Sequence, residues 1–160
     1  MGESFYLGRY EHALDAQFRV AIPSEWRGGD ACAFILFKGH DRTLTLFPVE
    51  VFMQFVDRVR GGSFASFEIQ ELLAWVGERT RKCQCDKQGR VKLDKEMLDA
   101  CGIGSQLELV GAITHILIRA PRTAEESLTR DDAFFAKLKE FSGDSGSDFL
   151  RGLLGSVDKK

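Results

Sequence analysis

The chain carries one short pattern twice, as Leu14-Asp15-Ala16-Gln17-Phe18-Arg19-Val20-Ala21-Ile22 and as Cys85-Asp86-Lys87-Gln88-Gly89-Arg90-Val91-Lys92-Leu93. The same offset of 71 residues separates the two aspartates and the two arginines. A second pair of segments, 34–48 and 107–121, matches at an offset of 73 residues, and each ends in a proline. Two matching blocks in the same order indicate a tandem duplication, and this duplication decides the fold.

Length and composition describe an ordinary globular chain. It has 160 residues, of which 44% are hydrophobic and 29% charged, and this balance excludes disorder over most of the chain. Lysine and arginine number 22 and aspartate and glutamate 24, which gives a formal net charge of -2. This charge excludes a protein that coats nucleic acid with a surface that is basic all over, but it does not exclude a local basic patch.

The sequence predicts a cytoplasmic protein with no membrane partner. No apolar run approaches the roughly 20 residues of a membrane span, and the N-terminus lacks the features of a signal peptide. In that compartment Cys32, Cys83, Cys85 and Cys101 are expected to be reduced thiols. Cys83 and Cys85 could seed a metal site, but no cysteine or histidine lies at a suitable spacing, so no metal is expected.

Both copies predict the same order of elements, and together they predict an α+β fold that is mainly β. A strand precedes the Asp-x-x-x-Arg segment, a second strand follows it, and then come a short helix and a β-hairpin. In the first copy we expect a strand over 20–23, a short helix over 24–27 and hairpin strands over 33–38 and 43–47. In the second copy the corresponding strand is expected over 91–93, the helix over 95–101 and the hairpin strands over 107–110 and 115–119. Helical apolar spacing predicts further helices over 49–59, over 66–79 and around Phe134, Phe135, Leu138 and Phe141, with fraying beyond Gly143.

The repeated Asp-x-x-x-Arg loop has two explanations. In the structural one, Asp15 and Asp86 cap a turn, Gly89 supplies a positive φ, and the arginines pair with the aspartates. In the functional one, the arginines present forked guanidinium groups to phosphates or guanine edges, and the aspartates fix their direction. Residues 79–92 favour the second explanation, because they hold six basic residues and one acidic residue in a net-negative chain.

The same loops, together with Tyr6-Leu7-Gly8, Pro23 and Leu109-Val110-Gly111, resemble the MraZ family over about residues 5–122. These are bacterial transcriptional regulators of the division and cell-wall gene cluster, related to AbrB-type swapped-hairpin DNA-binding proteins. The resemblance implies two pseudo-symmetric halves that form a small β-barrel, with flanking helices and several chains closing into a ring. It also implies a nucleoid-associated protein that binds repeated promoter boxes in double-stranded DNA.

Site residues follow from the resemblance. It implies Arg19 and Arg90 as the main DNA contacts, and Asp15, Asp86 and Gly89 as the residues that orient the loops. Further DNA-binding residues are expected at Lys87, Gln17, Arg9 and Lys92.

The sequence departs from the family pattern in three places, which are the first loop, Asp94 and the acidic tail after Thr123. Gln17 and Phe18 lack the charge and flexibility of Lys87 and Gly89, so the first loop is expected to change conformation and to bind DNA more weakly. Phe18 could instead be an apolar wedge or a packing residue of the ring. Asp94 stands where the first copy has Pro23, which is expected to weaken strand termination.

The expected organisation is a first half over 5–55, a helical connection over 56–80, a second half over 81–125, and an acidic helix and tail over 126–160. Seven aromatic residues either pack within the single chain or cover the interfaces between the chains of a ring. They are Phe52, Phe55, Phe64, Phe67, Trp75, Phe134 and Phe135. An assembly protein with weak or no DNA binding is the alternative function. We expect no enzyme, cofactor or small-molecule substrate, because no nucleotide loop, catalytic triad or metal set is present.

Overall fold

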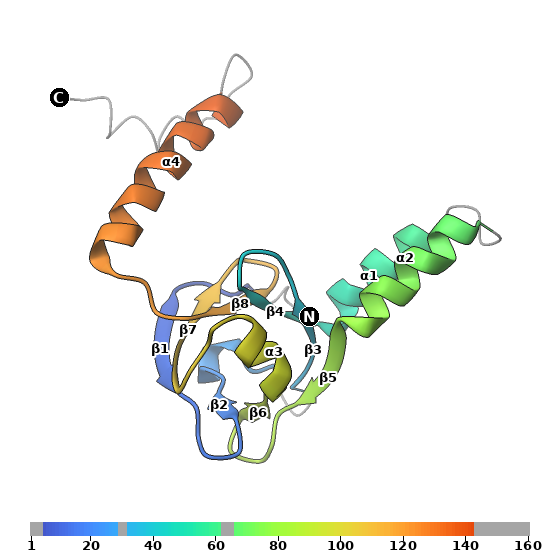
Figure 1. The fold of residues 1–160 in the computed structure, drawn as a ribbon, viewed down its shortest axis with the longest axis horizontal. Coiled ribbons are helices and arrows are strands. Elements are labelled where there is room, and N and C mark those ends of the chain that lie inside the picture. The colour runs from blue at the N-terminus through green and yellow to red at the C-terminus, as the bar shows by residue number, and fades with distance from the viewer. Residues whose placement is uncertain (1–4, 29–31, 62–65, 143–160) are drawn as a thin grey trace. The chain divides into compact units, whose positions relative to one another are not determined.

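The computed structural model describes residues 5–28, 32–61 and 66–142 (Figure 1). It divides into two compact units, Met1–Pro121 and Arg122–Lys160, which are described separately below. The fold is α+β and mainly β, as the sequence predicts. The expected fraying beyond Gly143 lies outside the described residues, as does Phe64.

The duplication is confirmed by the order of the elements. The first copy contains β1 (Arg9–Ala13), β2 (Arg19–Ala21), the 3-10 helix η1 (Ser24–Trp26), β3 (Ala33–Lys38), β4 (Leu44–Pro48), α1 (Val49–Arg60) and α2 (Phe67–Glu78). The second copy contains β5 (Thr80–Gln84), β6 (Arg90–Lys92), α3 (Lys95–Ala100), β7 (Gln106–Gly111), β8 (Ile116–Arg119) and α4 (Ala124–Ser142). Each element of the first copy up to α1 therefore has a counterpart in the second.

The two copies exchange strands. Strand β4 of the hairpin β3–β4 pairs with strand β8 of the hairpin β7–β8. The full order of the six-stranded sheet is β1-β7-β8-β4-β3-β5. Strand β1 pairs with β7 of the other copy, and β5 pairs with β3 in the same way. The exchange gives the sheet an internal pseudo-twofold symmetry, with β1 and β5 at its edges. The closed barrel that the family resemblance implies stays a prediction.

A separate two-stranded ribbon places the two Asp-x-x-x-Arg loops beside each other. Strands β2 and β6 are antiparallel, with Arg19 opposite Lys92 and Ala21 opposite Arg90. Val20 and Val91 face each other at the centre and are fully buried, so the ribbon is anchored in the core. Both loops extend from the same end of the molecule, at the bottom of Figure 1.

One expectation about the cysteines is wrong. Cys32 and Cys85 form a disulfide, with their Cα atoms 5.3 Å apart. They continue the register in which Ala33 lies opposite Gln84, and the Cys85 N–H donates to the Cys32 carbonyl at 2.8 Å. The strand exchange thus brings together two cysteines that are 53 residues apart in sequence.

The expectation for Asp94 is also wrong. Strand β6 ends at Lys92 just as β2 ends at Ala21, so strand termination is not weakened. The Asp94 carboxylate instead accepts a hydrogen bond from the Met97 N–H at 3.1 Å and caps α3. An N-terminal aspartate also favours the helix electrostatically, which explains why the second copy has an α-helix where the first has a single 3-10 turn.

The second unit contains α4. Thr123 and Glu126 form a capping box at its start, in which the Glu126 N–H donates to Thr123 Oγ1 at 3.1 Å and the Thr123 N–H donates to Glu126 Oε2 at 2.9 Å. The helix carries exposed Leu128, Phe134 and Phe135. The helix expected around Phe134 and Phe135 is therefore confirmed.

Candidate nucleic-acid interface

The first loop is organised by one carboxylate. Asp15 Oδ1 accepts hydrogen bonds from the backbone N–H groups of Gln17 at 2.8 Å and Arg19 at 2.9 Å. Its Oδ2 accepts from the Arg19 Nε–H at 2.7 Å. The aspartate therefore closes the turn and at the same time fixes the plane of the arginine side chain.

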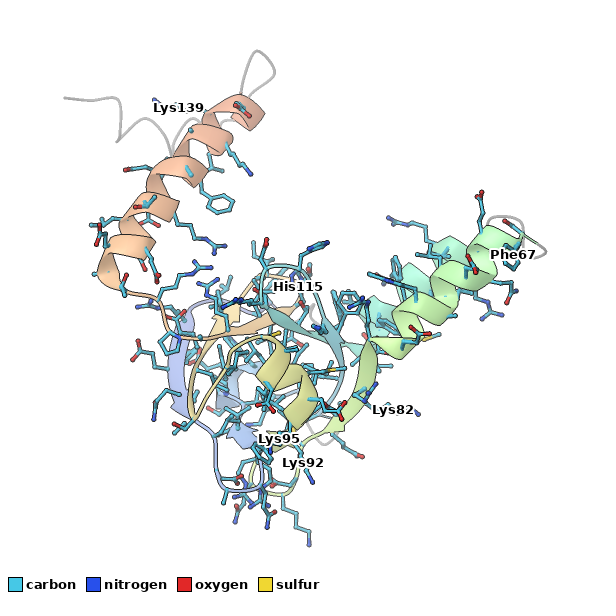
Figure 2. All side chains as sticks on the ribbon, in the orientation of Figure 1. Phe67, Lys82, Lys92, Lys95, His115 and Lys139 are labelled. Carbon is cyan, nitrogen blue, oxygen red and sulfur yellow. A yellow bond between two sulfur atoms is a disulfide. The ribbon has the colours of Figure 1, made fainter. Side chains whose placement is uncertain are left out.

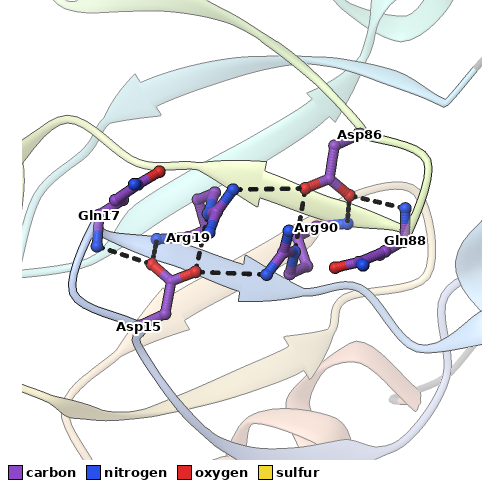
Figure 3. A network of polar contacts seen from close by, with 6 residues as sticks. All are labelled: Asp15, Gln17, Arg19, Asp86, Gln88 and Arg90. Carbon is purple, nitrogen blue, oxygen red and sulfur yellow. Dashed lines mark hydrogen bonds and ion pairs between the residues drawn. The ribbon is translucent and has the colours of Figure 1, made fainter.

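The second loop has the same geometry. Asp86 Oδ1 accepts from the N–H groups of Gln88 and Arg90, both at 2.9 Å, and its Oδ2 accepts from the Arg90 Nε–H at 2.9 Å. Figure 3 shows that Gln17 and Gln88 occupy equivalent positions. The counterpart of Lys87 is consequently Ala16, so the comparison of Gln17 with Lys87 made from the sequence is displaced by one residue.

Phe18 does not change the loop conformation, contrary to expectation. Its φ is 61°, close to the 78° of Gly89, and its N–H donates to the Asp15 carbonyl as that of Gly89 donates to Asp86. The Phe18 side chain packs against the hydrophobic core, and this contact compensates the cost of a left-handed conformation in a non-glycine residue.

The two loops are joined into one network (Figure 3). Arg90 Nη1 lies 3.6 Å from Asp15 Oδ2, and Arg19 Nη1 lies 3.9 Å from Asp86 Oδ2. Each carboxylate thus contacts its own arginine and the arginine of the other copy. Both arginine side chains keep 29% of their surface exposed, which leaves two oriented guanidinium groups accessible on one surface.

The network favours ionised aspartates. Backbone hydrogen bonding from Arg19 is the main reason that the pKa of Asp15 lies below its ordinary value, and the Arg19 side chain adds to it. Asp86 has a lowered pKa chiefly because it accepts the Arg90 N–H. The structural explanation of the loop is therefore confirmed: the aspartates cap turns and pair with arginines. The same contacts also fix the directions of the Arg19 and Arg90 guanidinium groups.

The remaining predicted residues separate into two groups. Gln17 and Lys87 are exposed in the loops, and Lys92 is exposed on β6 opposite Arg19. Arg9 lies six residues before Asp15, at the far end of β1, where its Nη1 is 3.2 Å from Oε1 of the buried Glu108. Arg9 therefore does not join the loops.

Two basic residues near the loops were not predicted from the sequence. The Arg27 guanidinium lies over Gly89 of the second loop. The Lys95 Nζ lies 5.8 Å from the centre of the Phe18 ring, over the first loop. Figure 2 places Lys92 and Lys95 at the loop end of the molecule. Neither residue belongs to the Asp-x-x-x-Arg pattern, and their counterparts in the other copy, Leu98 and Ser24, are not basic, so the repeat carried no signal for them.

The described part of the chain contains no group of three metal-binding side chains and no helix suited to span a membrane. Cys83 and Cys85 have different partners. Cys85 is bonded to Cys32, while the Cys83 Sγ–H donates to the Lys92 carbonyl at 3.4 Å. Burial raises the pKa of the Cys83 thiol to about 11.

Comparison with known proteins places the chain in a family, although no protein-family model matches it. Transcriptional regulator MraZ of Symbiobacterium thermophilum is 32% identical over 122 residues, which cover 76% of this chain and 88% of the relative. The protein of the same name from Roseiflexus castenholzii is 29% identical over 139 residues, or 84% of this chain and 97% of the relative. The protein of the same name from Thermomicrobium roseum is 28% identical over 116 residues, which cover 72% of this chain and 82% of the relative. The relatives are named as regulators rather than enzymes, and the chain belongs to the MraZ family of transcriptional regulators.

Proposed function

We propose that this protein regulates transcription by sequence-specific binding to double-stranded DNA through its paired Asp-x-x-x-Arg loops. The observation that carries the proposal is the joined network of Asp15, Arg19, Asp86 and Arg90, which fixes two partly exposed guanidinium groups on one surface. An oriented guanidinium can donate two parallel hydrogen bonds to O6 and N7 of guanine, or to a phosphate. Pre-orientation by the aspartates lowers the entropy lost on binding.

Electrostatics support the same surface. Lys87 is exposed in the second loop, and Lys92 is exposed on the adjoining ribbon. The chain as a whole carries a net charge of -2, so a cationic surface of this kind directs DNA to one face and away from the rest. In line with the family resemblance, the DNA we propose is a set of repeated promoter boxes of the division and cell-wall gene cluster.

The proposal includes a ring of several chains. Helices α1 and α2 and strands β3 and β4 enclose an apolar groove of about 290 Å³. Its walls include Phe55 and Trp75, whose side chains are 44% and 46% exposed. Exposed apolar surface of this kind marks an interface, and repeated contacts around a ring would convert weak single-loop contacts into strong binding to repeated boxes.

A binding titration tests the function. The probe is a fluorescent duplex from the DNA upstream of the protein's own coding sequence, with a scrambled duplex of equal composition for comparison. We expect Arg90→Ala to lose preference for the upstream duplex, because a bidentate base contact contributes about 1–3 kcal/mol in each engaged subunit. Arg19→Ala is expected to have a milder effect, since the first loop lacks a lysine.

Arg58→Ala is the matched control, because it removes the same charge from an exposed position on α1 outside the loops. Unchanged preference in Arg90→Ala would contradict the role of the second loop. A stable oligomer that binds neither duplex would identify the chain as an assembly protein instead.

A further inference from the structure

The residues that cover the two loops differ between the copies. Gly89 is buried beneath Arg27, and a Cβ atom at Gly89 would collide with the Arg27 guanidinium. Arg27 directly follows η1, so a side chain of the first copy lies on the loop of the second. Over the first loop the corresponding cation is Lys95, whose Nζ lies 5.8 Å from the centre of the Phe18 ring. The two loops therefore differ in the cation that lies over them, which is a partly buried arginine at the second loop and an exposed lysine at the first.

Arg27 directly follows a segment that is anchored in the core. Its N–H donates to the Ser24 carbonyl at 3.2 Å, and the neighbouring Trp26 is buried with its Nε1–H donating to the Leu7 carbonyl at 3.2 Å. The Arg27 Nε is buried and has no hydrogen-bond partner among the described residues. No carboxylate of the described residues lies within ion-pair distance of its guanidinium.

This charge matters because the central network is neutral. Asp15 and Asp86 offset the charges of Arg19 and Arg90, and the network orients guanidinium groups without adding net attraction for phosphate. Attraction to the DNA backbone grows with the number of phosphates that unpaired cations neutralise. Beside the second loop those cations are Lys87, Lys92 and Arg27, and Arg27 is the one that is partly buried.

We propose that Arg27 contacts a DNA phosphate next to the site of Arg90. This inference rests on the proposed DNA-binding function. In this arrangement Arg90 reads the base and Arg27 fixes the register of the loop on the backbone, which matches the general division between base contacts and phosphate contacts.

Salt dependence tests the proposal. Arg27→Gln keeps a long side chain over Gly89 but removes the charge, Arg27→Lys keeps the charge, and Arg58→Gln removes an exposed charge outside the loops. Binding of each full-length variant to the upstream duplex and to its scrambled counterpart is measured between about 50 and 200 mM salt. Circular dichroism melting and light scattering verify that fold and assembly are retained.

We expect Arg27→Gln to weaken binding to both duplexes by the same factor and to flatten the slope of log affinity against log salt by about 0.9 for each phosphate that Arg27 neutralises in the wild type. Arg27→Lys should retain the slope of the wild type, as should Arg58→Gln. A wild-type slope in Arg27→Gln would overturn the phosphate contact even if affinity fell, because Arg27 would then only position the loop. If Arg27→Gln does not fold, Arg27→Lys becomes the test of the phosphate contact. A salt slope flatter than that of the wild type would then overturn the contact, and a retained slope would support it.

These results are distinguishable from failure of the proposed function. If the wild type binds neither duplex, DNA binding itself is wrong and the role of Arg27 falls with it. If the wild type binds and Arg90→Ala loses preference while Arg27→Gln keeps the wild-type slope, the inference about Arg27 alone is wrong.

Discussion

At the scale of single residues, the two loops show how one backbone shape accepts different side chains. Phe18 and Gly89 share a left-handed φ, at a cost to phenylalanine of about 1–2 kcal/mol. Burial of the ring against the core offsets this cost. The difference between the loops therefore lies in charge rather than conformation, because Ala16 of the first loop corresponds to Lys87 of the second.

This comparison predicts the effect of adding a lysine to the first loop. In Ala16→Lys the new ammonium group should occupy the place that Lys87 has in the second loop. We expect the salt dependence of DNA binding to steepen by about 0.9 for each first loop that engages a phosphate. Ala133→Lys adds the same charge on α4 and is the control. Equal slopes for Ala16→Lys and the wild type would show that the first loop does not approach the backbone.

The aspartates predict a specific dependence of stability on pH. Asp86 has a lowered pKa in the folded protein, mainly because it accepts the Arg90 N–H, so its ionised form favours folding. This contribution is fully present above the ordinary aspartate pKa of about 4 and is lost as the pH falls through the lowered value. Asp86→Asn should be less stable than the wild type by a constant amount between pH 5 and about 8. Urea unfolding should show the difference shrinking below about pH 4, and a difference that persists there would assign the effect to something other than ionisation.

At the scale of strands and helices, the sequence predicted the elements but not their partners. Alternating apolar residues and turn residues are local signals, and the strand expected over 33–38 has these same bounds in the structure. The exchange that pairs β1 with β7 and β5 with β3 depends on contacts between distant segments, which no local pattern encodes. The repeat identified the four central residues of the site, whereas Arg27 approaches Gly89 only because the copies fold around each other.

The same exchange explains the disulfide that the sequence did not predict. Cys32 and Cys85 are separated by 53 residues and meet at one end of the β3–β5 pair. In the chain-entropy model, closing a loop of this length stabilises the folded state by about 4 kcal/mol. Reduction with dithiothreitol should lower the free energy of unfolding by up to about this amount, as measured by urea denaturation.

The double variant Cys32→Ser/Cys85→Ser is the control for reduction. It should be less stable than the oxidised wild type and should not respond to dithiothreitol. Cys83 and Cys101 are buried, so in the native protein they should resist alkylation at neutral pH, while the half-buried Cys85 becomes reactive after reduction. A wild type with equal stability in the two redox states would contradict the contribution of the disulfide.

At the scale of the whole molecule, duplication places two Asp-x-x-x-Arg loops in one chain. The two aspartates and two arginines then form one charge-balanced network. The duplication does not supply a partner for the apolar side chains of α1 and α2. Contacts to the sheet, such as Phe37 with Trp75 at 6.2 Å between ring centres and Phe47 with Phe52 at 6.5 Å, cover one face of this helix pair.

The uncovered apolar groove predicts that the isolated protein is an oligomer. Phe55 and Trp75 remain almost half exposed in the single chain, and a second copy seated on this surface would bury them. A contact between different surfaces of successive copies closes into a ring when the rotation between them permits, so light scattering should give a mass several times 17.9 kDa. Phe55→Glu should shift the protein toward the monomer, because a charge buried in an apolar interface is costly. Gln54→Glu adds the same charge at an exposed neighbouring position and should leave the mass unchanged. A wild type that scatters as one species of 17.9 kDa would show that these aromatics serve the single chain alone.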